Sequence, residues 1–340
     1  MDPVAPLAVE RLGLVGLTRR LVDIDSTTGR EGECGRVLAD YLRGRGFRVT
    51  EQAVDATRFN VLATLDAPCV TLSTHFDCVP PFFPSRPDGT RLVGRGVCDA
   101  KGILAAQVEA VEQLRAGGIR DVGMLFVVGE ERGSDGALVA NEQAPPTARF
   151  LVNGEPTDNR LGLGTRGIYR VRLHTTGRAA HSSYPELGES AIEKLLDVLL
   201  RMRTMPWPED ADMGRTHYNI GLIDGGVAHN VIPAHAMAEV LFRTVGETDA
   251  VRRILKALEP GVRIEEVLEG APVRMHTVSG FETAAFPYMT DIGMLPRWGK
   301  PLLYGPGSIF VAHTDDESIE IAHLERAVAD YVVLARQLRA

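Results

Sequence analysis

The pattern of hydrophobic and polar positions predicts alternating helices and strands in the first half of the chain. Apolar residues recur at helical spacing over residues 8–46, with a polar break near residues 26–32, and again over residues 101–115. Short apolar runs mark the expected strands, which lie at residues 60–65, 70–74, 122–128 and 150–152. The run at 122–128 is nearly continuous, as in sheets that are covered on both faces. This order favours an α/β fold.

The pattern changes after residue 164. Residues 168–174 alternate between apolar and polar positions, which predicts a strand with one solvated face. Ser190 and Glu193 form a capping-box signature for a helix that ends near Met202. Further strands are expected at residues 218–223 and 236–242, and a helix at residues 249–258. The resulting strand–helix–strand–strand–helix–strand order predicts a second, α+β domain of the ferredoxin-like type.

The length of the chain agrees with two domains. Its 340 residues exceed the size of a typical single core, and 44% of them are apolar, which is enough to fill two cores. We expect residues 1–164 and 276–340 to form the first domain, with a last helix over residues 319–338. Residues 165–275 form an inserted domain.

The composition limits which partners and which cellular location we expect for the protein. A net charge of -8 without a Lys/Arg-rich run argues against nucleic acid or an anionic membrane surface as partner. No apolar run approaches the roughly 18 residues needed to cross a bilayer, and no signal-peptide pattern is present at the start, so we expect a cytoplasmic protein. The four cysteines lack C-x-x-C spacing and are expected to be free thiols.

Acidic and imidazole groups follow several of the expected strands. Ligands of open α/β sheets bind at the carboxyl ends of the strands, so these groups are expected to meet there. The groups are His75, Asp77, Asp99, Glu130, Glu131, Glu155 and His313. Two imidazoles with several carboxylates and no thiolate suit zinc, cobalt or manganese. So many carboxylates would repel one another unless cations lay between them, and two ions about 3.5–4 Å apart account for them best.

The adjacent pair Glu130 and Glu131 suggests a division of labour. On an extended backbone neighbouring side chains point in opposite directions, so the two carboxylates are not expected to bind the same ion. One can be a ligand, while the other takes a proton from the attacking water and passes it to the leaving amine.

A competing pattern is the G-x-G-x-x-G sequence at residues 162–167, which would suggest a dinucleotide-binding oxidoreductase. That pattern must follow a strand and open a helix. Here it runs into the alternating strand at Ile168, so we interpret it as a hinge between the domains.

Seven short motifs, in this order along almost the whole chain, resemble the di-zinc family of deacylases and exopeptidases. The motifs are His75–Pro80, Gly94–Gly102, Glu130–Ser134, Glu155–Pro156, His181–Pro185, Gly225–Pro233 and Ala312–Glu317. The family contains acetylornithine deacetylase, succinyl-diaminopimelate desuccinylase and glutamate carboxypeptidase. The resemblance implies a zinc-exopeptidase-like catalytic domain with a mixed, mostly parallel sheet, and a lid or dimerisation domain at residues 165–275.

The resemblance also implies roles for individual residues. One metal ion would be held by His75, Asp99 and Glu155, and the other by Asp99, Glu131 and His313. Glu130 would be the general base and Asp77 would orient His75. His181 would stabilise the oxyanion in the partner subunit's site, which implies a homodimer. The peptide bond between Asp99 and Ala100 would be cis.

Substrate contacts and specificity follow less directly from the resemblance. Asn230, Arg243 and the backbone N–H groups of Gly305 and Gly307 are the implied contacts. We expect metal-dependent hydrolysis of an N-acyl amino acid of the acetylornithine or acetylcitrulline type, in arginine biosynthesis, with two zinc ions or, alternatively, cobalt. The alternatives are a desuccinylase, a dipeptidase or a carboxypeptidase of the same family and, outside this class, a non-catalytic metal-binding dimer.

Overall fold

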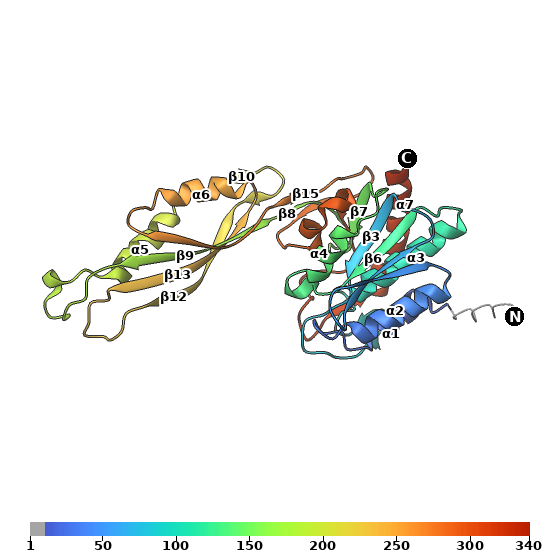
Figure 1. The fold of residues 1–340 in the computed structure, drawn as a ribbon, viewed down its shortest axis with the longest axis horizontal. Coiled ribbons are helices and arrows are strands. Elements are labelled where there is room, and N and C mark those ends of the chain that lie inside the picture. Colours follow the sequence, from blue (N-terminus) through green and yellow to red (C-terminus); the bar gives the residue numbers. More distant parts are fainter. Residues whose placement is uncertain (1–10) are drawn as a thin grey trace. The chain divides into compact units, whose positions relative to one another are not determined.

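The computed structural model describes residues 11–340 and contains two compact units (Figure 1). Unit 1 holds the described residues up to Leu163, Met275–Ala284 and Thr290–Ala340, and unit 2 holds Gly164–Arg274 and Ala285–Met289. The short segment Ala285–Met289, which we expected in the first domain, therefore groups with the second unit. Residues 8–10 of the first expected helix lie outside the described residues.

Unit 1 is built on a six-stranded sheet in the order β1-β2-β6-β3-β7-β17. Its strands are β1 (Arg48–Ala53), β2 (Phe59–Thr64), β3 (Val70–His75), β6 (Val122–Val127), β7 (Phe150–Asn153) and β17 (Lys300–Leu303). β3 pairs in parallel with β6 and β7, and β7 with β17, whereas β1 and β2 add an antiparallel edge. The predicted mixed, mostly parallel sheet is confirmed.

Helices cover both faces of this sheet (Figure 1). On one face lie α1 (Gly13–Val22), α2 (Gly32–Gly44), α3 (Lys101–Ala116) and α7 (Ile321–Arg339), and on the other lie α4 (Asp135–Glu142) and the 3-10 turns η3 (Asp291–Met294) and η4 (Pro296–Trp298). Strand β6 shows why its apolar run is continuous. Met124 and Phe126 belong to the core on the first face, while Leu125 and Val127 belong to the core on the second.

Short elements complete the two units. They are β4 (Arg86–Asp88), β5 (Arg91–Val93), the 3-10 turns η1 (Glu130–Arg132) and η2 (Pro185–Leu187), β10 (Glu209–Asp210), β11 (Gly214–Arg215), β15 (Val273–Arg274), β16 (Thr283–Phe286) and β18 (Ser318–Glu320). Strand β18 pairs antiparallel with β5, which in turn pairs with β4. Strand β16 and the 3-10 turns η3 and η4 lie between β15 and β17.

The glycine-rich segment at residues 162–167 contains the boundary between the two units, which falls between Leu163 and Gly164, but its backbone is extended. It lies in β8 (Leu161–Thr165), which pairs with β15 through Gly164 and Thr165, and it continues into β9 (Gly167–Thr176). No helix follows the glycines, which agrees with the rejection of a dinucleotide site.

Unit 2 has the expected ferredoxin-like topology. Its elements follow one another as β9, α5 (Ala191–Met202), β12 (His217–Gly225), β13 (His235–Thr244), α6 (Thr248–Lys256) and β14 (Arg263–Gly270). The sheet order is β12-β13-β9-β14 with antiparallel neighbours throughout. Alternate residues of β9 are buried, and Ser190 Oγ accepts a hydrogen bond from the Glu193 N–H at the start of α5 (3.2 Å), as the capping-box signature predicted.

In the described part of the chain, no helix is both long enough and apolar enough to cross a membrane.

Candidate metal centre

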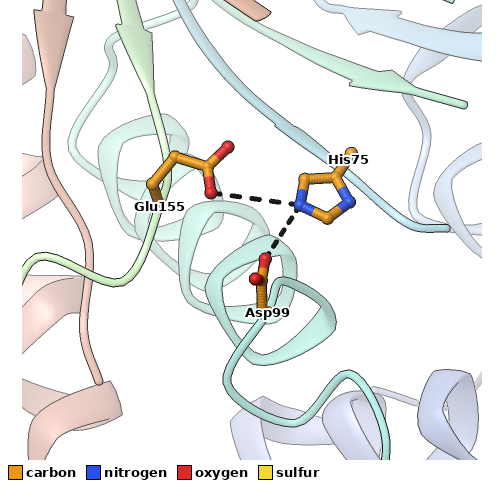
Figure 2. A group of neighbouring side chains, drawn as sticks. All are labelled: His75, Asp99 and Glu155. Atoms are coloured by element: carbon orange, nitrogen blue, oxygen red, sulfur yellow. Dashed lines mark hydrogen bonds and ion pairs between the residues drawn. The ribbon is translucent and has the colours of Figure 1, made fainter. Parts of the chain in front are cut away.

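The first predicted ligand group forms at the carboxyl edge of the unit 1 sheet (Figure 2). His75 ends β3, Glu155 follows β7 by two residues, and Asp99 lies two residues before α3. The Nε2 atom of His75 is 2.9 Å from Asp99 Oδ1 and 4.0 Å from Glu155 Oε2. All three side chains are buried, so the chain has placed an imidazole and two carboxylates together away from water.

The second predicted group shares Asp99 with the first. His313 Nε2 lies 3.3 Å from Asp99 Oδ2 and 2.9 Å from Glu131 Oε1. His313 adopts a left-handed backbone conformation (φ 64°), and 49% of its side chain is exposed. The two oxygens of Asp99 thus face different imidazoles, which is the arrangement of a carboxylate that bridges two ions. The peptide bond between Asp99 and Ala100 is cis, as the resemblance implied.

The donor set fits a pair of divalent cations. Two ligand atoms bound to one tetrahedral zinc ion lie about 3.3 Å apart, and the four distances above, from 2.9 to 4.0 Å, bracket this value. The second oxygen of Glu155, Oε1, is buried and has no hydrogen-bond partner among the described residues. A buried carboxylate oxygen without a partner is costly, and a cation bound there would remove this cost. The identity of the metal stays a prediction.

The pKa shifts of the ligands reflect the same need for positive charge. Burial, followed by the neighbouring charge of Glu130, raises the pKa of Glu155 well above its usual range. Burial by itself lowers the pKa of His75, but hydrogen bonds to Asp77 and Asp99 outweigh it and raise this pKa well above its usual range. Hydrogen bonds to the two carboxylates that face it raise the pKa of His313 to about 10. In the metal-free protein, therefore, protonated imidazoles supply the positive charge.

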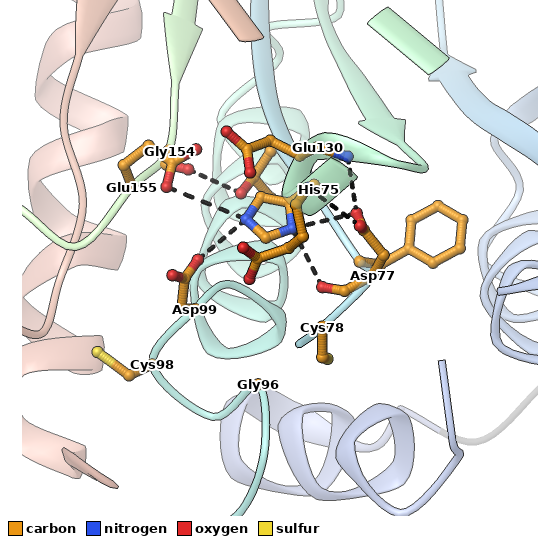
Figure 3. Close-up of polar contacts among 12 residues, drawn as sticks. His75, Asp77, Cys78, Gly96, Cys98, Asp99, Glu130, Gly154 and Glu155 are labelled. Carbon is orange, nitrogen blue, oxygen red and sulfur yellow. Dashed lines mark hydrogen bonds and ion pairs between the residues drawn. The ribbon is translucent and has the colours of Figure 1, made fainter. Parts of the chain in front are cut away.

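Asp77 holds both the first imidazole and the Glu130–Glu131 turn (Figure 3). His75 Nδ1 lies 3.1 Å from the Asp77 carbonyl oxygen and 3.4 Å from its Oδ1. The N–H of Glu130 donates to Oδ1 (3.1 Å) and that of Glu131 donates to Oδ2 (3.2 Å). Oδ2 also accepts a hydrogen bond from the Thr28 hydroxyl at 2.8 Å. The carboxylate of Asp77 is thus fully engaged in positioning its neighbours.

The backbone at Glu130 and Glu131 differs from the expectation. These residues form a 3-10 turn after β6, not an extended strand end, because the N–H groups of the turn are bound by Asp77. The argument from opposite side-chain directions on a strand was therefore wrong. Of the two residues Glu131 joins a ligand group and Glu130 does not, and burial raises the pKa of Glu130 well above its usual range.

Two buried carboxyl groups near the centre were not singled out from the sequence. Asp291, at the start of η3, is buried, and this burial raises its pKa to about 7. Its charge acts on Glu130, although it lies 161 residues further along the chain. Glu317 is buried beside Asp99. The only sequence signal for Glu317 was its place at the end of the motif that carries His313. No local sequence pattern distinguishes Asp291.

His181 and Asn230 lie next to each other in unit 2. His181 forms a β-bridge with Val231, and the N–H of Ser182 donates to the carbonyl of Asn230 (3.0 Å). Both side chains are exposed.

Arg243 is half-buried on β13, opposite His217 on β12. Burial lowers the pKa of Arg243, and no carboxylate of the described residues forms an ion pair with it. Arg166 Nη1 lies 2.6 Å from His217 Nδ1. Three basic side chains therefore gather at this point of unit 2.

Close packing around the ligands explains why glycine stands at positions 305 and 307. The N–H of Gly305 already donates to Thr157 Oγ1 (2.9 Å), so it does not face a substrate as expected. A Cβ atom at Gly305 would lie 2.4 Å from the carbonyl oxygen of Glu155. At Gly307, where φ is +81°, a Cβ atom would lie 2.5 Å from Cys98 Sγ. A substrate contact through Gly307 stays a prediction.

All four cysteines are free thiols, as expected. Cys69 is half-buried and the other three are buried. Burial raises the pKa of the Cys78 thiol to about 11. Cys78 and Cys98 flank the centre but belong to neither ligand group.

An α/β unit that gathers two histidine–carboxylate groups around one shared aspartate is typical of dinuclear metallohydrolases. Residues 163–260 match the family model of the peptidase dimerisation domain, M20_dimer. The chain is 37% identical over 370 residues to a probable carboxypeptidase of Aspergillus clavatus, an alignment that covers 95% of this chain and 82% of that protein. It is 39% identical over 361 residues to a probable carboxypeptidase of Aspergillus terreus, covering 92% and 83%.

Solved structures share the fold over nearly the whole chain. Aminopeptidase PepT of Bacillus cereus superposes with a TM-score of 0.80 at 20% identity, covering 96% of this chain and 98% of that chain. A dinuclear metal-binding peptidase of the M20 family from Bacillus subtilis superposes with a TM-score of 0.71 at 16% identity, covering 95% and 96%. The chain belongs to the M20 family of metallopeptidases, whose members hydrolyse amide and peptide bonds.

Proposed function

We propose that this protein is a dinuclear metallopeptidase that removes an amino acid from the carboxyl end of a short peptide. The observation that carries the proposal is the pair of ligand groups that share Asp99, with Glu130 beside them but in neither group. The M20 relatives compared above are named carboxypeptidases and peptidases, not deacetylases. The alternative that the sequence suggested is therefore better supported than an acetylornithine-deacetylase-like activity, which stays the second candidate.

His75, Asp99 and Glu155 would hold one divalent ion, and Asp99, Glu131 and His313 the other, with zinc first and cobalt second among the candidates. When bound, two such ions polarise the scissile carbonyl group and supply an activated water. Asp77 keeps the ring of His75 and the backbone of the glutamate turn in place, as its hydrogen bonds show.

Glu130 would be the general base. Its carboxylate form, which neighbouring positive charge favours, takes a proton from the attacking water and passes it to the amine that leaves. Figure 3 shows its side chain extending into the group of His75, Asp99 and Glu155. A carboxyl group that lies beside the metal ligands but belongs to neither ligand group is suited to proton transfer. A protein that only stored metal ions would not need such a group.

Unit 2 would contribute to binding and assembly. The match to a peptidase dimerisation domain supports a homodimer formed through this unit. By the family resemblance, His181 would stabilise the oxyanion in the partner's site, and Asn230 would contact the substrate. Arg243, beside the basic side chains of Arg166 and His217, would bind the free α-carboxylate of a peptide.

The test is amine release by chelator-stripped protein that has been reloaded with Zn²⁺ or Co²⁺. The panel contains dipeptides, N-blocked dipeptides, the same N-blocked dipeptides as carboxyl-terminal amides, N-acetylornithine and N-succinyl amino acids. We expect metal-dependent release from peptides with a free carboxyl end and none from the amides. Turnover of N-acetylornithine alone would favour the second candidate.

Glu130→Gln separates catalysis from binding. We expect kcat to fall by about 10²- to 10⁴-fold, as is typical when a general base is lost, while the protein still binds two equivalents of Co²⁺. Full activity of this variant would contradict the assigned role. Two bound ions without turnover of any substrate in the panel would favour a non-catalytic metal-binding dimer.

A further inference from the structure

Glu317 lies buried beneath the loop that carries Asp99. Its Oε1 atom accepts hydrogen bonds from the backbone N–H groups of Gly96 (2.9 Å), Cys98 (3.1 Å) and Asp99 (3.1 Å). Figure 3 shows this loop running past His75. These three N–H groups precede helix α3 and belong to no strand. The carboxylate therefore supplies the hydrogen-bond acceptor that a helix or a sheet would otherwise provide.

The second oxygen of Glu317 is bound by a buried arginine. Arg95 Nη1 donates to Oε2 at 2.8 Å, and 1% of each side chain is exposed. Arg95 Nε donates to the carbonyl of Pro81 (3.2 Å), and its guanidinium lies over the ring of Phe83 at 5.0 Å from the ring centre. The ion pair therefore connects Glu317 to the segment that follows His75, and a buried pair of this kind tolerates the loss of one partner poorly.

The backbone of Glu317 joins the same network. Its carbonyl accepts a hydrogen bond from the Gly94 N–H (3.1 Å), and the next residue, Ser318, pairs with Val93 as β18 meets β5. His313 lies only four residues before Glu317. The segment of His313 and the loop of Asp99 are thus joined through one residue, although they are more than 200 positions apart in the sequence.

We propose that Glu317 is a positioning residue of the metal centre, which fixes the backbone of the bridging ligand Asp99 relative to the segment that carries His313. A bridging carboxylate must direct its two oxygens at two different ions, and here they face His75 at 2.9 Å and His313 at 3.3 Å. Three backbone N–H groups donate to one oxygen of Glu317, so that oxygen fixes the position of the Asp99 backbone. This inference rests on the proposed function only in requiring that the centre binds metal ions.

The test compares two variants in which the buried arginine charge has been removed. Arg95→Met with Glu317→Gln keeps an oxygen that can accept the three N–H bonds, whereas Arg95→Met with Glu317→Leu keeps none. The measured quantities are the Kd for Co²⁺ of the chelator-stripped proteins and the visible absorption spectrum of the bound Co²⁺, at a temperature where both proteins are folded. Arg326→Met with Glu325→Gln, a change of two exposed residues in α7, is the matched control for the loss of both charges.

We expect the Leu variant to bind Co²⁺ about 10- to 100-fold more weakly than the Gln variant, the usual effect of removing a group that orients metal ligands, and to show an altered spectrum. The control should match the wild type. Equal Kd values and spectra for the two variants would overturn the inference. If the wild type bound no Co²⁺, the proposed function would fail instead.

If the Leu variant does not fold, amide hydrogen exchange of the wild-type protein tests the proposal instead. The N–H groups of Cys98 and Asp99 should exchange at least 100-fold more slowly than those of an open loop, with and without Co²⁺. Exchange at the open-loop rate would show that Glu317 does not hold them and would equally overturn the inference.

Discussion

Loading of the metal centre at pH 7 should release protons, because the imidazoles of the metal-free protein are charged. The pKa of His313 is raised to about 10, three units above the working pH, and that of His75 is raised well above its usual range. An imidazole nitrogen must lose its proton before it binds a metal ion. Hydrogen bonds to the two imidazoles lower the pKa of Asp99 despite its burial, so this ligand is already ionised and releases nothing.

The expected release is therefore at least two protons for two ions bound. The raised pKa of Glu155 adds up to one more. Each coupled proton makes binding more favourable by about 1.4 kcal/mol per pH unit. Two protons therefore lower the product of the two dissociation constants about 100-fold between pH 6 and pH 7.

Calorimetric titration of the chelator-stripped protein with Co²⁺, in buffers with different enthalpies of ionisation, measures this number directly. The slope of the observed enthalpy against the buffer enthalpy is the number of protons released. His323→Gln is the control, because His323 is exposed and belongs to neither ligand group. A slope below two protons for two bound ions would refute the reasoning, since at least one of the imidazoles would then be neutral before metal binds.

Three further predictions concern stability and packing. The raised pKa of His313 contributes stability that is fully present below its unfolded pKa of about 6.5 and is lost as the pH rises to about 10. The metal-free protein should therefore unfold at lower urea concentration at pH 9 than at pH 7, and an equal midpoint would contradict this. Gly305→Ala places a Cβ atom 2.4 Å from the Glu155 carbonyl oxygen, so we expect weaker Co²⁺ binding by calorimetry, and an unchanged Kd would show that the backbone there can yield. Phe242→Ala removes a fully buried ring from the core of unit 2 and should lower the free energy of unfolding by about 3–5 kcal/mol in urea titrations. The exposed Phe310→Ala is its control, and equal losses for both would contradict the assigned packing.

Elements with a strong local pattern were predictable from the sequence. Helix α3 and strand β6 appear within one residue of the expected bounds, because a buried helix face and a strand covered on both sides each leave a periodic or continuous apolar signal. Strand β1 and helix α4 were missed. β1 is a largely exposed edge strand, and α4 has only eight residues, so neither produces such a signal.

The sequence also determined which residues could form the centre. Its imidazoles and carboxylates follow successive strands, and the ends of neighbouring parallel strands must lie at the same edge of a sheet. His75 and Glu155 thus came together as expected, from β3 and β7, which are neighbours in the sheet. The residue types at these strand ends already favoured zinc, cobalt or manganese over a thiolate site.

Only the tertiary structure decided the orientation of these groups. Asp99 turns its two oxygens to different imidazoles. Glu130 and Glu131 lie on a 3-10 turn that Asp77 holds. Both arrangements depend on hydrogen bonds between segments far apart in the sequence. The bonds from Glu317 to the loop of Asp99 span more than 200 residues. Local periodicity reports only which face of an element is buried, so it carries no information about contacts of this kind, and the fold alone determines them.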